Sequence, residues 1–244
     1  MGVLKTLTDE YFGDSIRKED EINISGLDVE IVKFKDNNGV EHKHGYRVID
    51  GDPNKMAKTL KTLIERIIEK RGSECSLNDI DVSNIKHMYY RENFYYGIFE
   101  NSSFDGDISG WNVSNVTSIN SMFCESEFTG KNGIFSLEKG NKVEDMSYVF
   151  YDSYFDGDLS GWNVSNVKSI HNMFSYSDFT GKNGMFRLEK GNKVEDMSDM
   201  FCDSPFEVDI NDWEVNGYCN LINMFKNTPL ENNNKLPKWY LDRQ

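Results

Sequence analysis

The sequence predicts an α+β fold dominated by a β-solenoid, built from leucine-rich-repeat-like parallel-β coils and closed at its N-terminal end by a β-hairpin and a helix. Residues 104–154 and 155–205 are identical at 38 of 51 positions, and tryptophans recur at the same interval as Trp111, Trp162 and Trp213. Phenylalanines recur at alternating steps of 24 and 27 residues, so each long unit contains two coils. A period of about 20–29 residues is typical of leucine-rich repeats.

Apolar positions of the repeat are expected to form the core. Stacked coils place each apolar residue over the same position of the next coil, and neighbouring coils then share one continuous core. The tryptophans and the recurring Met-Phe pairs are the largest of these residues. The expected rungs include Ile108/Leu159/Ile210, Trp111/Trp162/Trp213, Met122/Met173/Met224 and Phe123/Phe174/Phe225.

The repeat motif carries a family resemblance. The segments DISGWNVSNVTSINSMF and DLSGWNVSNVKSIHNMF resemble the repeat of BspA-like leucine-rich-repeat surface proteins. They are closer still to the WDVSNVTNMSxMF type found in bacterial lipoproteins and in phage or mobile-element proteins. The resemblance covers residues 104–225 well and 76–103 poorly. It implies a non-enzymatic repeat module that serves adhesion or interaction at a surface.

Four segments are predicted along the chain. Residues 1–21 are expected to form an N-terminal helix that docks on another surface, because Leu4, Leu7 and Tyr11 lie at helical spacing. Residues 22–73 form an N-terminal cap, 74–226 the repeat region and 227–244 a C-terminal cap. A repeat array needs such caps because its terminal coils otherwise expose apolar surface.

The N-terminal cap is predicted to hold two strands and a helix. Residues 28–35 and 41–49 are expected to be strands of a hairpin, joined by a linker that contains Asn-Gly. Asp52 followed by Pro53 predicts a helix start, with Asp52 as the N-cap, and Gly72 predicts its end.

Charge excludes some function classes. The chain carries 41 acidic and 27 basic residues, a net charge of −14, of which −13 falls on residues 74–244. Nucleic-acid binding requires basic patches, so we expect no nucleic-acid partner. No run approaches the ~18 apolar residues of a membrane span. The sequence also lacks a signal peptide and a lipobox cysteine, which predicts a cytoplasmic protein, or a virion protein if the source is a phage.

Motifs for catalysis and cofactor binding are absent from the sequence, so we expect neither enzymatic activity nor a cofactor. No GxSxG, HExxH, P-loop or GxGxxG motif occurs. The repeated Asp105-Gly106-Asp107 and Asp156-Gly157-Asp158 leave calcium as an alternative, since carboxylates near glycine can ligate this ion. The simpler interpretation is a turn between coils, stabilised by hydrogen bonds to the aspartates.

Surface positions of the repeat are the candidate interaction residues. The two near-identical copies differ at 13 positions, several of them polar and exposed by pattern. A scaffold that keeps its core and varies its surface suits recognition, and it also suits neutral drift. The candidates are Ser109, Asn112, Thr117, Asn120, Glu125, Ser160, Asn163, Lys168, His171 and Tyr176.

Two functions are compatible with these observations. The first is a binding module that recognises a protein, or a glycan, through the surface of the repeat. The alternative is a structural accessory subunit of a larger assembly such as a phage virion, anchored on an assembly neighbour by the N-terminal helix.

Overall fold

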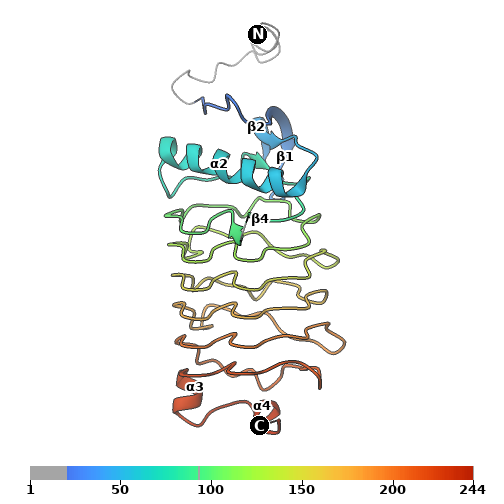
Figure 1. The fold of residues 1–244 in the computed structure, drawn as a ribbon, viewed down its shortest axis with the longest axis vertical. Helices are drawn as coiled ribbons and strands as arrows, with labels where there is room; N and C mark the ends of the chain where they lie inside the picture. The colour runs from blue at the N-terminus through green and yellow to red at the C-terminus, as the bar shows by residue number, and fades with distance from the viewer. Residues whose placement is uncertain (1–20, 93, 244) are drawn as a thin grey trace, which may run out of the picture.

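The computed structural model describes residues 21–92 and 94–243, which form a column of stacked coils with a hairpin and a long helix at one end (Figure 1). The predicted N-terminal helix lies outside these residues. No helix in the described part of the chain is long and apolar enough to cross a membrane.

The N-terminal cap contains the predicted hairpin and helix. Strands β1 (Val29–Lys35) and β2 (Glu41–Val48) pair antiparallel, and β2 pairs in parallel with the short β3 (Ile80–Asp81). Helix α2 spans Pro53–Arg71. The Asp52 side chain accepts a hydrogen bond from Lys55 N, and the amide of Gly72 donates to Ile68 O, which confirms both predicted ends.

The predicted dominant β-solenoid is wrong. The described residues contain only a three-stranded sheet, β1-β2-β3, and the two-stranded hairpin of β4 (Tyr89–Arg91) and β5 (Tyr95–Gly97). Between coils there are single-residue parallel bridges, such as Ser118 to Asp145 and Asp145 to Ser169. The coils do stack as the repeat predicts, but their backbone is made of turns.

Left-handed backbone explains why strands do not form. One wall of the stack, called here the ladder wall, consists of residues 118–125, 145–152, 169–176, 196–203 and 220–227. In each of these segments two non-glycine residues four positions apart have φ between 47° and 60°, for example Ser121 and Glu125. A left-handed residue turns the chain, so no run of extended residues reaches the length of a strand.

Hydrogen bonds on the ladder wall replace those of a sheet. Alternate amides of one coil donate to carbonyls of the next: Ile119 N to Asp145 O (3.0 Å) and Ser121 N to Ser147 O (3.0 Å). The amides of Phe123 and Glu125 continue the series, and the following coils repeat it. In all of these bonds the amide belongs to one coil and the carbonyl to the next coil toward the C-terminus, so the hydrogen bonds have the same polarity along the whole stack.

Stacked phenylalanines fill the core as predicted. One column runs from Phe99 through Phe123 and Phe150 with ring centroids 5.0 and 5.5 Å apart, and it continues to Phe225. A second column runs from Phe104 to Phe206 at about 6 Å spacing. The rings of both columns are fully buried, so the repeat period observed in the sequence is the period of the core.

Short elements close the C-terminal end of the stack. Helices α3 (Pro229–Asn232) and α4 (Lys238–Leu241) lie there (Figure 1). Trp239 Nε1 donates to Ile210 O at 2.9 Å, and the ring of Tyr240 meets Phe225 edge to face at 5.0 Å. These contacts cover the last rung of the core.

Candidate functional site

An aromatic cluster lies on the ladder wall at the middle of the stack. Tyr148, Tyr151, His171 and Tyr176, here called the tyrosine cluster, come from two successive coils. Tyr148 lies 5.6 Å from Tyr151 and 5.0 Å from His171, and Tyr151 meets Tyr176 edge to face at 5.7 Å. Tyr176 is 53% exposed, so its ring is accessible to a ligand.

Two members of the cluster occupy strained backbone. Tyr148 and Tyr176 have φ of 58° and 59°. Their equivalents in other coils are mostly Asn or Asp, which adopt this conformation with less strain than other non-glycine residues. A bulky side chain there costs roughly 1–2 kcal/mol. The local fold therefore disfavours tyrosine at both positions.

Carboxylates surround the cluster. The row of left-handed residues at the C-terminal edge of the ladder wall, here called the αL row, consists of Asn101, Glu125, Asp152, Tyr176, Asp203 and Asn227. The negative charge of Asp203 is the largest cause that raises the pKa of Tyr176, and the neighbouring Cys202 adds to this rise. Burial raises the pKa of Tyr151, and Tyr176 and Asp152 add to that rise. The surface is therefore aromatic and electronegative at once.

Thiols at the cluster are held in their protonated form. Burial, followed by Glu100 and Glu125, raises the pKa of Cys124 to about 12. Burial and the hydrogen bond to Asp203 raise the pKa of Cys202 to about 12. A thiolate is the nucleophilic form of cysteine, so neither residue is poised for nucleophilic chemistry near neutral pH.

His171 does not form a catalytic triad with its neighbours. Its Nδ1 lies 2.8 Å from Ser198 Oγ, and Ser198 Oγ donates its own proton to Asp196 Oδ1 at 2.5 Å. In a Ser-His-Asp triad the hydroxyl donates to histidine and the carboxylate orients the ring. Here Nε2 of His171 contacts the hydroxyl of Tyr148 at 3.0 Å, so the network orients the cluster.

Six of the predicted interaction residues lie on or beside the ladder wall. Glu125, His171 and Tyr176 belong to the cluster or its acidic border, while Asn120 Nδ2 donates to Asp145 at 3.0 Å. Thr117 Oγ1 donates to Lys86 O, and Lys168 forms an exposed ion pair with Glu144. The six residues form three pairs, Thr117/Lys168, Asn120/His171 and Glu125/Tyr176. The two members of each pair occupy equivalent positions two coils apart.

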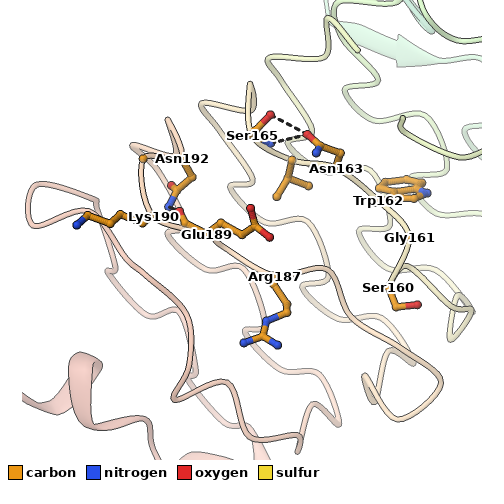
Figure 2. Close-up of a pocket in the computed structure, with 11 residues that line it drawn as sticks. Ser160, Gly161, Trp162, Asn163, Ser165, Arg187, Glu189, Lys190 and Asn192 are labelled. Carbon is orange, nitrogen blue, oxygen red and sulfur yellow. Dashed lines mark hydrogen bonds between the residues drawn. The ribbon is translucent and has the colours of Figure 1, made fainter. Parts of the chain in front are cut away.

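The remaining four lie on a different stretch of the coil. Ser109 and Asn112 are partly buried, and Ser109 Oγ accepts a hydrogen bond from Asn38 in the hairpin turn. Ser160 and Asn163 line a groove of about 290 Å³ beside Trp162 (Figure 2). The structure thus divides the ten candidates between two surfaces.

Two residues of the cluster, Tyr148 and Tyr151, are not among the interaction residues predicted from the sequence. Both lie where the two copies differ: the second copy has Asp199 and Cys202 there. Grouping those differences by their position in the coil would have found the cluster.

The repeated aspartates do not form a calcium site in the structure. Asp105 Oδ1 accepts from the amide and the hydroxyl of Thr129 at 2.9 and 2.7 Å, and Asp105 Oδ2 pairs with Lys131. Asp156 makes the corresponding bonds to Thr180 one unit later. Residues 21–92 and 94–243 contain no group of three or more metal-binding side chains that could hold an ion.

One comparison assigns the chain to a family. A family model described as "Mycoplasma protein of unknown function, DUF285" matches residues 69–142 and again residues 137–239. Together the matches span most of the chain and the whole coil stack, so the protein belongs to this family. Neither a curated protein nor a solved structure gave a match to the chain.

Proposed function

We propose that the chain is a non-enzymatic recognition module, which binds a basic segment of a protein partner at the tyrosine cluster. One observation carries the proposal: tyrosine occupies two left-handed positions that favour Asn or Asp. Residues that cost stability where smaller ones would fit are typical of functional surfaces.

The chemistry of the cluster favours a cationic ligand. An ammonium or guanidinium group over a tyrosine ring gains about 0.5–2 kcal/mol, depending on desolvation. Glu125, Asp152 and Asp203 border the rings and supply charge-assisted hydrogen-bond acceptors. The negative charge of the repeat region attracts such a segment over a longer range.

Variation between the copies reaches this surface. Of the 13 differences, four change a residue of the cluster or its border: Asn120/His171, Glu125/Tyr176, Tyr148/Asp199 and Tyr151/Cys202. The core positions change only conservatively. The copies therefore differ in the surface that they present and share the scaffold.

Fluorescence anisotropy with defined peptides tests the proposal. The probe is a labelled twelve-residue peptide of alternating Arg and Gly, and citrulline replaces each Arg in its neutral counterpart. We expect micromolar binding of the Arg peptide that weakens at least fivefold in the double variant Tyr148→Asn/Tyr176→Asn. This variant preserves the net charge, so a general attraction to an acidic protein does not change.

Tyr154→Asn is the matched control. Tyr154 is 59% exposed, lies in the same coil and does not have a positive φ. Equal binding by the wild type and the double variant would refute the site. Tyrosine-dependent binding of a neutral glycan, with no binding of the Arg peptide, would refute the ligand class.

The alternative role as a structural accessory subunit depends on residues 1–20 and stays a prediction, as do the cytoplasmic or virion location and the resemblance to BspA-like proteins. No surface of the described residues supports that role in the way that the strained tyrosines support recognition.

A further inference from the structure

The tetrapeptide Ser-Gly-Trp-Asn occurs twice, at residues 109–112 and 160–163. Both tryptophans are buried in the same way: Trp111 Nε1 donates to Leu77 O at 2.8 Å, and Trp162 Nε1 donates to Phe135 O at 3.0 Å. The two copies therefore present the same backbone and side chains to their surroundings.

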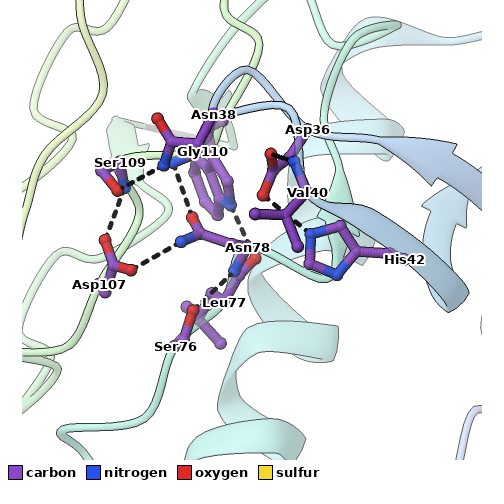
Figure 3. A network of polar contacts seen from close by, with 11 residues as sticks. Asp36, Asn38, Val40, His42, Ser76, Leu77, Asn78, Asp107, Ser109 and Gly110 are labelled. Atoms are coloured by element: carbon purple, nitrogen blue, oxygen red, sulfur yellow. Dashed lines mark hydrogen bonds and ion pairs between the residues drawn. The ribbon is translucent and has the colours of Figure 1, made fainter.

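In the first copy, the turn between β1 and β2 docks on this tetrapeptide. Asn37 N donates to Gly110 O at 2.8 Å. Asn38 Nδ2 donates to Ser109 Oγ at 2.9 Å (Figure 3). A Cβ on Gly110 would lie 2.7 Å from an oxygen of Asp36, so the contact requires glycine. A tight turn rich in Asp and Asn is thus a ligand for Ser-Gly-Trp-Asn within the chain itself.

In the second copy, the same atoms are uncovered. Ser160 and Gly161 are exposed, and a Cβ on Gly161 would meet no atom within 4 Å. Among the described residues no donor reaches Gly161 O or Ser160 Oγ. The groove that they line continues past Trp162 to Arg187 and Lys190 (Figure 2).

The third copy has a different sequence and a contact of its own. Asn211 and Asp212 replace Ser-Gly, and Lys238 N donates to Asn211 Oδ1 at 2.8 Å. Arg187 forms an ion pair with Asp212. Of the three equivalent positions, the first is buried beneath the hairpin turn, the third is contacted by Lys238 and Arg187, and the second has no such contact.

We infer that the open Ser160–Gly161 groove is a docking site for an Asp/Asn-rich tight turn of a partner protein. The turn would donate a backbone N–H to Gly161 O and a side-chain amide to Ser160 Oγ, as residues 36–39 do at the first copy. Arg187 occupies a position that is Ser136 in the first copy, and its exposed ion pair with Asp212 leaves a cation beside the groove that an acidic turn can share. This site shares no residue with the tyrosine cluster, so it does not depend on the proposed function.

A peptide copied from the chain is the probe. We would cyclise residues 32–44 as a hairpin, label the peptide with fluorescein and titrate the full chain while measuring anisotropy. We expect saturable binding with a Kd below about 1 mM, the weak end of specific affinity. Binding should weaken at least tenfold with the variant Gly161→Gln, and likewise when Asn37 of the probe is N-methylated, because each change removes one side of the same contact.

Gly217→Gln is the matched control for the protein. Gly217, like Gly161, is exposed, has no positive φ, and would place a Cβ in open space, so both variants should keep the wild-type melting temperature. Binding that is unchanged by Gly161→Gln would place the probe elsewhere and overturn the inference, as would absence of binding at 1 mM. The Tyr148→Asn/Tyr176→Asn variant should bind this probe normally, which separates this test from that of the proposed function.

Discussion

Lys61 and Glu231 close the two ends of one row of hydrogen bonds that runs the length of the stack. Lys61 Nζ, on α2, lies 3.2 Å from Glu100 O, the first carbonyl of the row. Each later carbonyl accepts from an amide of the αL row, beginning with Asn101 N to Cys124 O at 3.0 Å. The last amide, Asn227 N, donates to Glu231 Oε2 at 2.7 Å. A cation thus meets the carbonyl end and an anion meets the amide end, as in the capping of helices.

Removing the cation should therefore destabilise the fold. Lys61 is 19% exposed, and Lys61→Met keeps its apolar stem while leaving Glu100 O without a charged donor. We expect the free energy of unfolding to fall by about 1–3 kcal/mol, measured by urea denaturation. Lys58→Met is the control, because its ion pair with Glu92 is exposed and should contribute less than about 1 kcal/mol. Equal losses in both variants would contradict the capping role.

Relief of backbone strain should be visible at Tyr176. We expect Tyr176→Asn to raise the free energy of unfolding by about 0.5–1 kcal/mol, because Asn tolerates the left-handed conformation better than tyrosine does. Tyr154→Asn removes an exposed tyrosine without a positive φ and should give no such gain. Thermal denaturation of the Tyr176→Asn and Tyr154→Asn variants measures this difference. A loss of stability in Tyr176→Asn would show that the ring contacts of Tyr176 outweigh the backbone strain.

The core of the stack could be predicted from the sequence, but its backbone conformation and the tyrosine cluster could not. The period of the phenylalanines predicted the stacking and the core, because burial must repeat wherever coils stack. The backbone was harder to predict, since Asn and Asp occupy most of the left-handed positions but also occur elsewhere in the repeat, and Glu125 and Tyr148 carry no sequence signal for positive φ. The expectation of strands failed for this reason. The members of the tyrosine cluster lie on successive coils that are offset by 24 or 27 residues. Their proximity can be seen in the sequence only after the coils are aligned with these alternating offsets.

Acid should weaken the hairpin through Asp36. Burial acts to raise the pKa of Asp36, but the hydrogen bonds from His42 and Val40 N outweigh it and leave the pKa lowered. A lowered folded-state pKa means that Asp36 stabilises the fold above its unfolded value of about 3.9 and loses this contribution as the pH falls through the folded value.

Asp36→Asn tests this pH dependence. The variant should be less stable than the wild type at pH 7 by about 1–3 kcal/mol, and the difference should shrink below pH ~4. Urea denaturation at several pH values measures it. Glu41→Gln changes an exposed carboxylate of the same hairpin and serves as the control. A difference that is constant from pH 7 down to pH 3 would mean that the charge of Asp36 has no part in its effect.

Cys124 should be unreactive for an electrostatic reason as well as a steric one. With a pKa of about 12, its thiolate fraction at pH 8 is roughly a thousandfold below that of an ordinary thiol of pKa ~8.5. We expect alkylation by iodoacetamide, followed by peptide mass spectrometry, to be at least a hundredfold slower in the folded chain than in urea. The folded rate should rise about tenfold per pH unit from pH 8 to 10, because only the thiolate reacts.

Glu125→Gln separates the two causes. Glu125 is one of the carboxylates that raise the pKa of Cys124, so its neutralisation should lower that pKa and speed alkylation several-fold. Glu127→Gln is the control, since Glu127 is exposed nearby and is not among the groups that shift this thiol. If Glu125→Gln left the rate unchanged, burial and the more strongly acting Glu100 would protect Cys124 without a contribution from Glu125. The acidic border of the tyrosine cluster would then be too well screened to act on a neighbouring group, and its attraction for a basic ligand would be correspondingly weak.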